Sequence, residues 1–75
     1  IRQLDDHQTV HMPARNLIPG TTLLVQIKHR FDPDPRSIEV TLPPDFVVGR
    51  PIRLTGQGRR IGQWRGDLYL RLLAR

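Results

Sequence analysis

Residues 38–44 read Ile-Glu-Val-Thr-Leu-Pro-Pro. Apolar and polar side chains alternate along this stretch, and in a β-strand successive side chains point to opposite faces of the sheet. We therefore expect Ile38, Val40 and Leu42 to face a core. The two prolines that follow end the strand, because proline has no N–H group for the ladder. The stretch predicts a half-buried strand over residues 37–42.

The same alternation recurs elsewhere between turn signals. The 75 residues include seven prolines and six glycines, and helix signals are nearly absent. Further strands are predicted over residues 9–12, 23–31, 52–55 and 67–73, with one helical turn over 14–18 and a glycine- and arginine-rich loop over 56–66. The sequence therefore predicts an all-β fold, a small two-layer β-sandwich of short strands with at most one short helical turn.

Length and composition narrow the class of protein. We expect a single domain over residues 1–75, in which residues 1–7 form a linker or a disordered end. The first residue is not methionine, so we expect the chain to be part of a longer protein. Without cysteine, disulfides and thiolate zinc sites are excluded, and a reducing, cytoplasmic location is expected. No apolar run is long enough for a membrane helix and no leader is evident, so no membrane partner is predicted.

The charge balance is basic. Twelve Lys and Arg residues against seven Asp and Glu give a formal net charge of +5. Such a balance suggests an acidic partner, either nucleic acid or an acidic peptide. The alternative is that arginines spread along the chain keep a small sheet soluble.

Three segments of the second half stand in a characteristic order. Residues 38–44 are followed by residues 52–58, Ile-Arg-Leu-Thr-Gly-Gln-Gly, and then by residues 66–70, Gly-Asp-Leu-Tyr-Leu. In order and spacing these segments resemble the C-terminal domains of DnaJ-type co-chaperones, and a looser match in the first half extends the resemblance to residues 8–74. The chain departs from the family where a glycine usually follows the proline motif. It also has neither the His-Pro-Asp motif of a J domain nor a cysteine-rich zinc region.

The resemblance implies a shallow hydrophobic groove that holds unfolded client polypeptides between the first two strands, with help from the last. The matching positions in this sequence are Val10, Met12, Val25, Ile27 and Leu70. Extended peptides can add to a sheet edge through main-chain hydrogen bonds, and apolar pockets then supply affinity. The alternative is that all five residues are ordinary core residues.

The resemblance also implies that basic residues beside the groove receive the acidic C-terminal tail of the seventy-kilodalton heat-shock chaperone. Lys28 and Arg30 are the matching positions. Their pairing with carboxylates would weaken with salt. The alternative is a solvated strand face. A parent protein of this family would be a homodimer, whereas this chain alone is expected to be monomeric.

A basic loop with one aromatic residue offers a second kind of contact. Arg59, Arg60, Trp64 and Arg65 combine the positive charge and the stacking surface that nucleic acid requires. The alternative is a solvated loop. No nucleophile, paired catalytic carboxylates or phosphate-binding glycine loop is evident, so we expect no enzymatic activity, no cofactor and no metal site.

Three functions follow from these observations. The first is non-catalytic binding of extended apolar segments of unfolded polypeptides, as the client-binding domain of a DnaJ-class co-chaperone. The second is a basic nucleic-acid-binding module, since some relatives of these co-chaperones associate with DNA. The third is a structural spacer between other domains.

Overall fold

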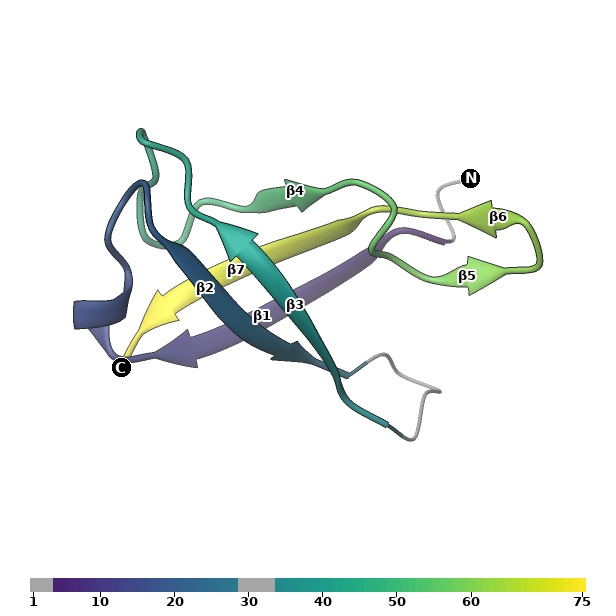
Figure 1. Cartoon of the computed structure of the whole chain (residues 1–75), viewed down its shortest axis with the longest axis horizontal. Coiled ribbons are helices and arrows are strands. Elements are labelled where there is room, and N and C mark those ends of the chain that lie inside the picture. The colour runs from purple at the N-terminus through teal and green to yellow at the C-terminus, as the bar shows by residue number, and fades with distance from the viewer. Residues whose placement is uncertain (1–3, 29–33) are drawn as a thin grey trace.

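The computed structural model describes residues 4–28 and 34–75. Within them the chain forms two facing sheets and a small hairpin (Figure 1). The elements in chain order are β1 (Asp6–Met12), the 3₁₀ turn η2 (Ala14–Asn16), β2 (Thr22–Ile27), β3 (Arg36–Thr41), β4 (Ile52–Leu54), β5 (Arg60–Ile61), β6 (Trp64–Arg65) and β7 (Leu68–Ala74). This arrangement confirms the predicted small all-β fold.

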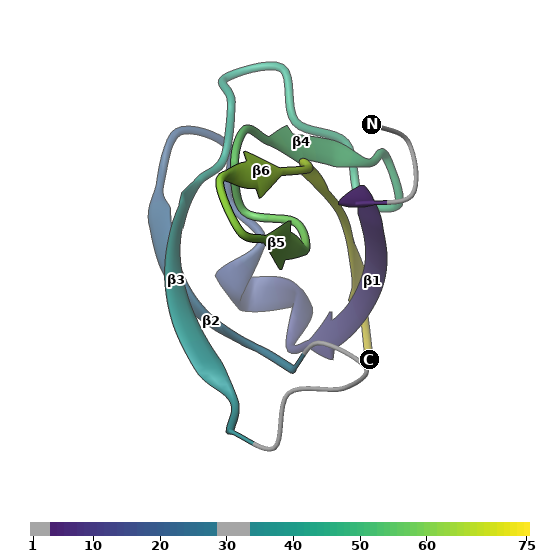
Figure 2. The same cartoon turned by 90° about the vertical axis from the view of Figure 1, so that its right-hand side faces the viewer.

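The strand order places the first and last strands side by side. One sheet has the order β1-β7-β4, in which β1 pairs with β7 in parallel and β4 pairs with β7 in antiparallel fashion. The second sheet is the antiparallel pair β2-β3. Viewed end on, β2 and β3 lie on one side of the molecule and β1 on the other (Figure 2). The sheet pairing therefore depends on β7, which lies between β1 and β4.

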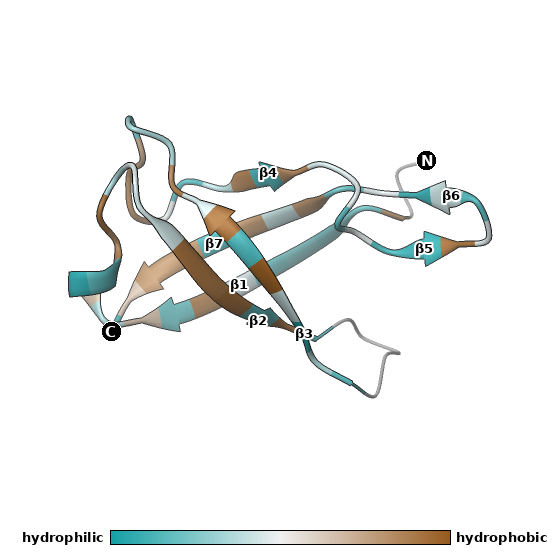
Figure 3. Ribbon diagram, viewed as in Figure 1, coloured by the Kyte–Doolittle hydropathy of each residue, from teal (hydrophilic) through white to brown (hydrophobic). Residues whose placement is uncertain are grey.

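The core lies between the two sheets and is built by alternate residues of their strands. Hydrophobic residues are concentrated along β2, β3 and β7 (Figure 3). The buried residues that form one cluster are Leu17, Val25, Ile27, Ile38, Val40, Leu42, Phe46, Leu68, Leu70 and Leu72. Ile38, Val40 and Leu42 are thus buried, as the alternation of residues 38–44 predicts.

Two sequence-based expectations are corrected. Residues 4–7 are not a linker or disordered end, because Leu4 is buried and β1 already begins at Asp6. Residues 56–66 are not only a loop, because β5 and β6 pair within them as a hairpin. Its turn places Gly62 at a φ of 58°, a left-handed conformation that glycine adopts without strain. Residues 29–31 of the predicted second strand lie outside the described residues.

Close backbone packing holds the base of the hairpin against the start of β1. A Cβ atom on Gly66 would overlap the backbone of Leu4, and one on Gly58 would lie 2.7 Å from the Leu4 carbonyl oxygen. The Arg59 N–H donates to that same oxygen at 2.7 Å. Only glycine permits such an approach of three backbone segments.

Asp67 ties β4 to the start of β7. Its Oδ1 accepts the backbone N–H of Gly56 at 2.9 Å, and its Oδ2 accepts from Arg53 Nε at 2.8 Å. These bonds stabilise the carboxylate, first through Gly56 and then through Arg53, and they lower the pKa of Asp67 below its ordinary value.

No helix within residues 4–28 and 34–75 is long and apolar enough to cross a membrane.

Candidate functional site

The β1 strand has one paired edge and one open edge. The Asp6 N–H donates to the Asp67 carbonyl at 2.9 Å, and the Met12 carbonyl accepts from Arg75 N–H at 3.1 Å. Backbone groups in a parallel strand alternate in direction, so even-numbered residues of β1 bond β7 and odd-numbered residues turn away. Within residues 4–28 and 34–75, β1 pairs only with β7, and no bond outside that pairing reaches the backbone N–H or C=O of Thr9 or His11. Toward the part of the chain that the structure describes, these two residues therefore present the unpaired backbone groups of an edge strand.

The β2 strand also has an open edge, and that edge faces β1 at one end. The Leu42 N–H donates to the Thr21 carbonyl at 2.8 Å, so odd-numbered residues of β2 bond β3 and even-numbered residues turn outward. Just beyond β2, the carbonyl of Lys28 accepts from Gln8 Nε2 on β1 at 3.3 Å. The two open edges therefore approach each other closely enough for one side chain to join them.

Half-buried apolar side chains accompany these edges. Val10 and Met12 on β1 and Leu23 on β2 point inward and pack against the core cluster without being fully buried. Sequence reasoning named Val10 and Met12 but missed Leu23. Leu23 begins the strand predicted over residues 23–31, and only the packing shows that its side chain stays partly accessible. These three side chains are available to a chain that pairs with either edge.

The other predicted groove residues lie deeper. Val25, Ile27 and Leu70 are 2%, 1% and 0% exposed and belong to the core. They pack in the core beneath the two open edges, but their side chains are not accessible to a ligand. Of the predicted tail-binding pair, Lys28 is exposed and Arg30 lies outside the described residues.

The β5–β6 hairpin separates its basic and apolar side chains. Ile61 is opposite Trp64, and both are largely exposed, at 66% and 56%. On the other side of the ribbon Arg60 is opposite Arg65, an arrangement of like charges that costs stability unless an anion or solvent screens it. Arg59 is half-buried at the base. The hairpin thus brings the four predicted basic and aromatic residues together, but on different faces.

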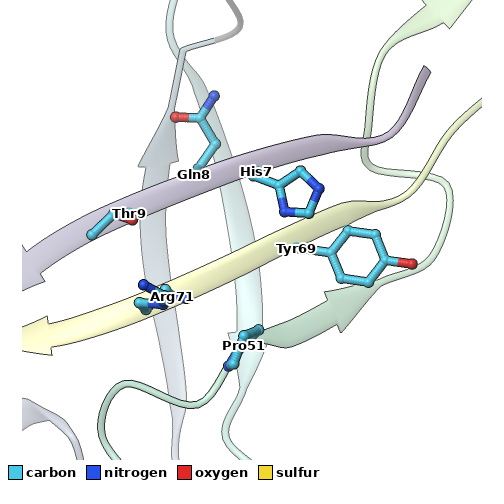
Figure 4. Close-up of a pocket in the computed structure, with 6 residues that line it drawn as sticks. All are labelled: His7, Gln8, Thr9, Pro51, Tyr69 and Arg71. Carbon is cyan, nitrogen blue, oxygen red and sulfur yellow. The ribbon is translucent and has the colours of Figure 1, made fainter. Parts of the chain in front are cut away.

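The outer face of the three-stranded sheet carries a feature that the sequence did not reveal. His7 and Tyr69 are cross-strand neighbours, and their rings lie 5.0 Å apart with an angle of 14° between their planes. A hollow beside them is lined by His7, Gln8, Thr9, Pro51, Tyr69 and Arg71 (Figure 4). Alternation alone could have placed His7, Tyr69 and Arg71 on outward faces, but not on neighbouring strands.

These surfaces offer groups for non-covalent contacts. Among the residues that the structure describes, no three His, Cys, Asp or Glu side chains lie close enough to hold a metal ion. The open edges offer hydrogen-bonding groups beside apolar side chains. The outer face offers Arg71 near two aromatic rings, whereas the hairpin carries Trp64 and its arginines Arg60 and Arg65 on opposite faces. No family model and no curated protein sequence matches this chain.

Proposed function

We propose that the chain binds extended apolar segments of unfolded polypeptides by adding them as a strand to the open edge of β1. The observation that carries this proposal is that the backbone groups of Thr9 and His11 have no partner among residues 4–28 and 34–75 and lie next to the half-buried side chains of Val10 and Met12. An exposed strand edge is a template for another chain. Natural proteins use the same geometry to bind peptides of varied sequence.

The side chains along the β1 edge alternate between inward apolar and outward polar residues, and they match a client segment whose apolar and polar residues alternate in the same way. Inward-pointing residues of an added strand meet Val10 and Met12, and outward-pointing residues lie beside His7, Thr9 and His11. Met12 suits varied partners, because its flexible thioether adapts to different side chains. Ordering an unfolded client costs conformational entropy, so we expect weak, reversible binding.

The resemblance of residues 38–44, 52–58 and 66–70 to DnaJ-type co-chaperones supports the same proposal. In that setting the domain is cytoplasmic and presents clients to a seventy-kilodalton heat-shock chaperone. The exposed Lys28, beside the bond that joins the two edges, would contact the acidic tail of that chaperone. The reaction is association only, with no bond made or broken.

The proposal is tested by an NMR titration with a peptide of alternating apolar and polar residues. We expect the largest shifts at the amides of Thr9 and His11 and at the methyl groups of Val10 and Met12. The substitution Thr9→Pro removes the outward N–H but no bond to β7, and edge strands tolerate proline. It should abolish peptide binding while the rest of the spectrum stays that of a folded domain.

The matched control is Leu24→Pro, which removes an outward N–H from the open edge of β2 instead. Peptide binding should survive this change if β1 is the template. Loss of binding in Leu24→Pro with full binding in Thr9→Pro would contradict the assignment to β1. Absence of peptide-induced shifts in the unmodified protein would contradict the proposed function itself.

A further inference from the structure

The outward positions of the three-stranded sheet form a cationic and aromatic face. From β1 they are His7, Thr9 and His11, from β7 Tyr69, Arg71 and Leu73, and from β4 Arg53. None of these seven positions is a carboxylate. Asp67, at the start of β7, bonds Arg53. A surface of this sign attracts anions and disfavours cationic ligands.

Two rings form a stacking surface on this face. The His7 and Tyr69 rings are nearly parallel, with centroids 5.0 Å apart, and they lie side by side in Figure 4. His7 is exposed and Tyr69 is half-buried, and no described element covers this side of β1 and β7. Planar groups bind such rings by stacking, because every aromatic heterocycle has a π-face.

An exposed cation lies two residues further along the same face. Arg71 lies opposite Thr9, two residues along from the Tyr69–His7 pair, which corresponds to about 6.6 Å of strand. Arg71 is exposed and makes no ion pair with any residue in 4–28 or 34–75. Together with Pro51, these residues line a hollow of about 160 Å³. The hollow combines a stacking surface, a guanidinium and a hydroxyl.

We infer that this face binds single-stranded nucleic acid. One base stacks on the His7–Tyr69 rings, and an adjoining phosphate pairs with Arg71 and the Thr9 hydroxyl. Arginine suits phosphate because its planar fork donates two parallel hydrogen bonds. An acidic peptide would satisfy Arg71 but leave the rings unused, whereas a nucleotide uses both. The backbone edge proposed for clients is a different part of β1, so this site is an additional one.

The hairpin is a competing location for the same ligand. Trp64 offers a ring and Arg60 and Arg65 offer cations, but the ring and the cations lie on opposite faces of a two-stranded ribbon. On the sheet, by contrast, the rings of His7 and Tyr69 share one face with Arg71. The sheet face therefore offers one nucleotide both contacts at once.

The test measures binding of a fluorescently labelled oligothymidylate by anisotropy at several salt concentrations. We expect Tyr69→Leu to weaken binding about fivefold or more, because stacking on one ring is lost. Arg71→Gln should weaken binding and reduce the slope of log affinity against log salt by about 1. Arg50→Gln is the matched control, because Arg50 is an exposed cation in the loop before β4, beside Asp45. Arg50→Gln should change the affinity and the salt slope less than Arg71→Gln does.

Two further measurements keep the inference falsifiable. Poly-glutamate of equal charge should bind more weakly than the oligonucleotide, and equal binding would overturn the stacking contact. Trp64→Ala should retain most of the affinity. If Trp64→Ala abolishes binding while Tyr69→Leu and Arg71→Gln bind like the unmodified protein, the ligand is on the hairpin and the inference is wrong. Circular dichroism of each variant checks that the fold is retained.

Discussion

The side-chain amide of Gln8 donates to the carbonyl oxygen of Lys28 at 3.3 Å, and this hydrogen bond joins the open edges of β1 and β2. The same Nε2 donates to Asp6 Oδ2 at 2.8 Å. One amide thus anchors a buried carboxylate at the start of β1 and reaches across to the end of β2. Both proposed surfaces on β1 depend on this strand being held in place.

We predict that Gln8→Ala lowers the free energy of unfolding by about 0.5–1.5 kcal/mol, because two acceptors lose their donor. Chemical denaturation followed by circular dichroism measures this loss. Gln26→Ala is the control, since Gln26 is an exposed amide on β2. Equal stability of the two variants would show that neither hydrogen bond of Gln8, to Asp6 or to Lys28, stabilises the fold measurably.

Leu70→Ala and Met12→Ala should separate the core from the binding edge. Leu70 is fully buried, so its truncation should cost about 2–5 kcal/mol of stability. Met12 is only half-buried, so Met12→Ala should cost less stability. It should, however, measurably weaken the binding of the apolar peptide. Paired denaturation and peptide titrations distinguish the two effects. A peptide affinity that is unchanged in Met12→Ala would argue against apolar contacts at the β1 edge.

Gly66→Ala should destabilise the fold more than Gly62→Ala. The added Cβ at Gly66 overlaps the Leu4 backbone, and overpacking of this kind costs about 1–3 kcal/mol or more. At Gly62 nothing lies within 4 Å, so the cost is the left-handed strain alone, about 1–2 kcal/mol. Thermal melts of the two variants measure the difference. An equally mild effect at both positions would contradict the close packing of the hairpin base.

Acid should destabilise the domain through Asp67. Bonds from Gly56 and Arg53 lower the pKa of Asp67 below 3.8 in the folded protein. A lowered folded pKa means that the stabilisation is fully present above the unfolded value and is lost as pH falls below it. Asp67→Asn should therefore flatten the dependence of melting temperature on pH below about pH 4.

Arg53→Gln provides the contrast, because it removes the second cause of the shift and leaves the Gly56 bond, the largest one, intact. Much of the acid dependence should survive in this variant. An Asp67→Asn protein whose melting temperature falls with acid as steeply as that of the unmodified protein would assign the effect to other carboxylates.

The sequence by itself determined the fold class and most of the core. Alternation along residues 38–44 correctly predicted that Ile38, Val40 and Leu42 face the core, because the side-chain period of a strand depends only on local backbone geometry. The prolines and glycines likewise marked where strands end. The hairpin β5–β6 could not be predicted from alternation, because a two-residue strand is too short to show any.

Only the tertiary structure decided which strands are neighbours. Pairing β1 with β7 joins segments about sixty residues apart, and no local pattern encodes that choice. The pairing leaves the backbone groups of Thr9 and His11 without a partner among residues 4–28 and 34–75, and it sets His7 beside Tyr69. Burial of Val25, Ile27 and Leu70 was likewise settled by packing of one sheet on the other. Alternation shows which residues share a face, but long-range packing determines whether that face is covered, open or next to another strand.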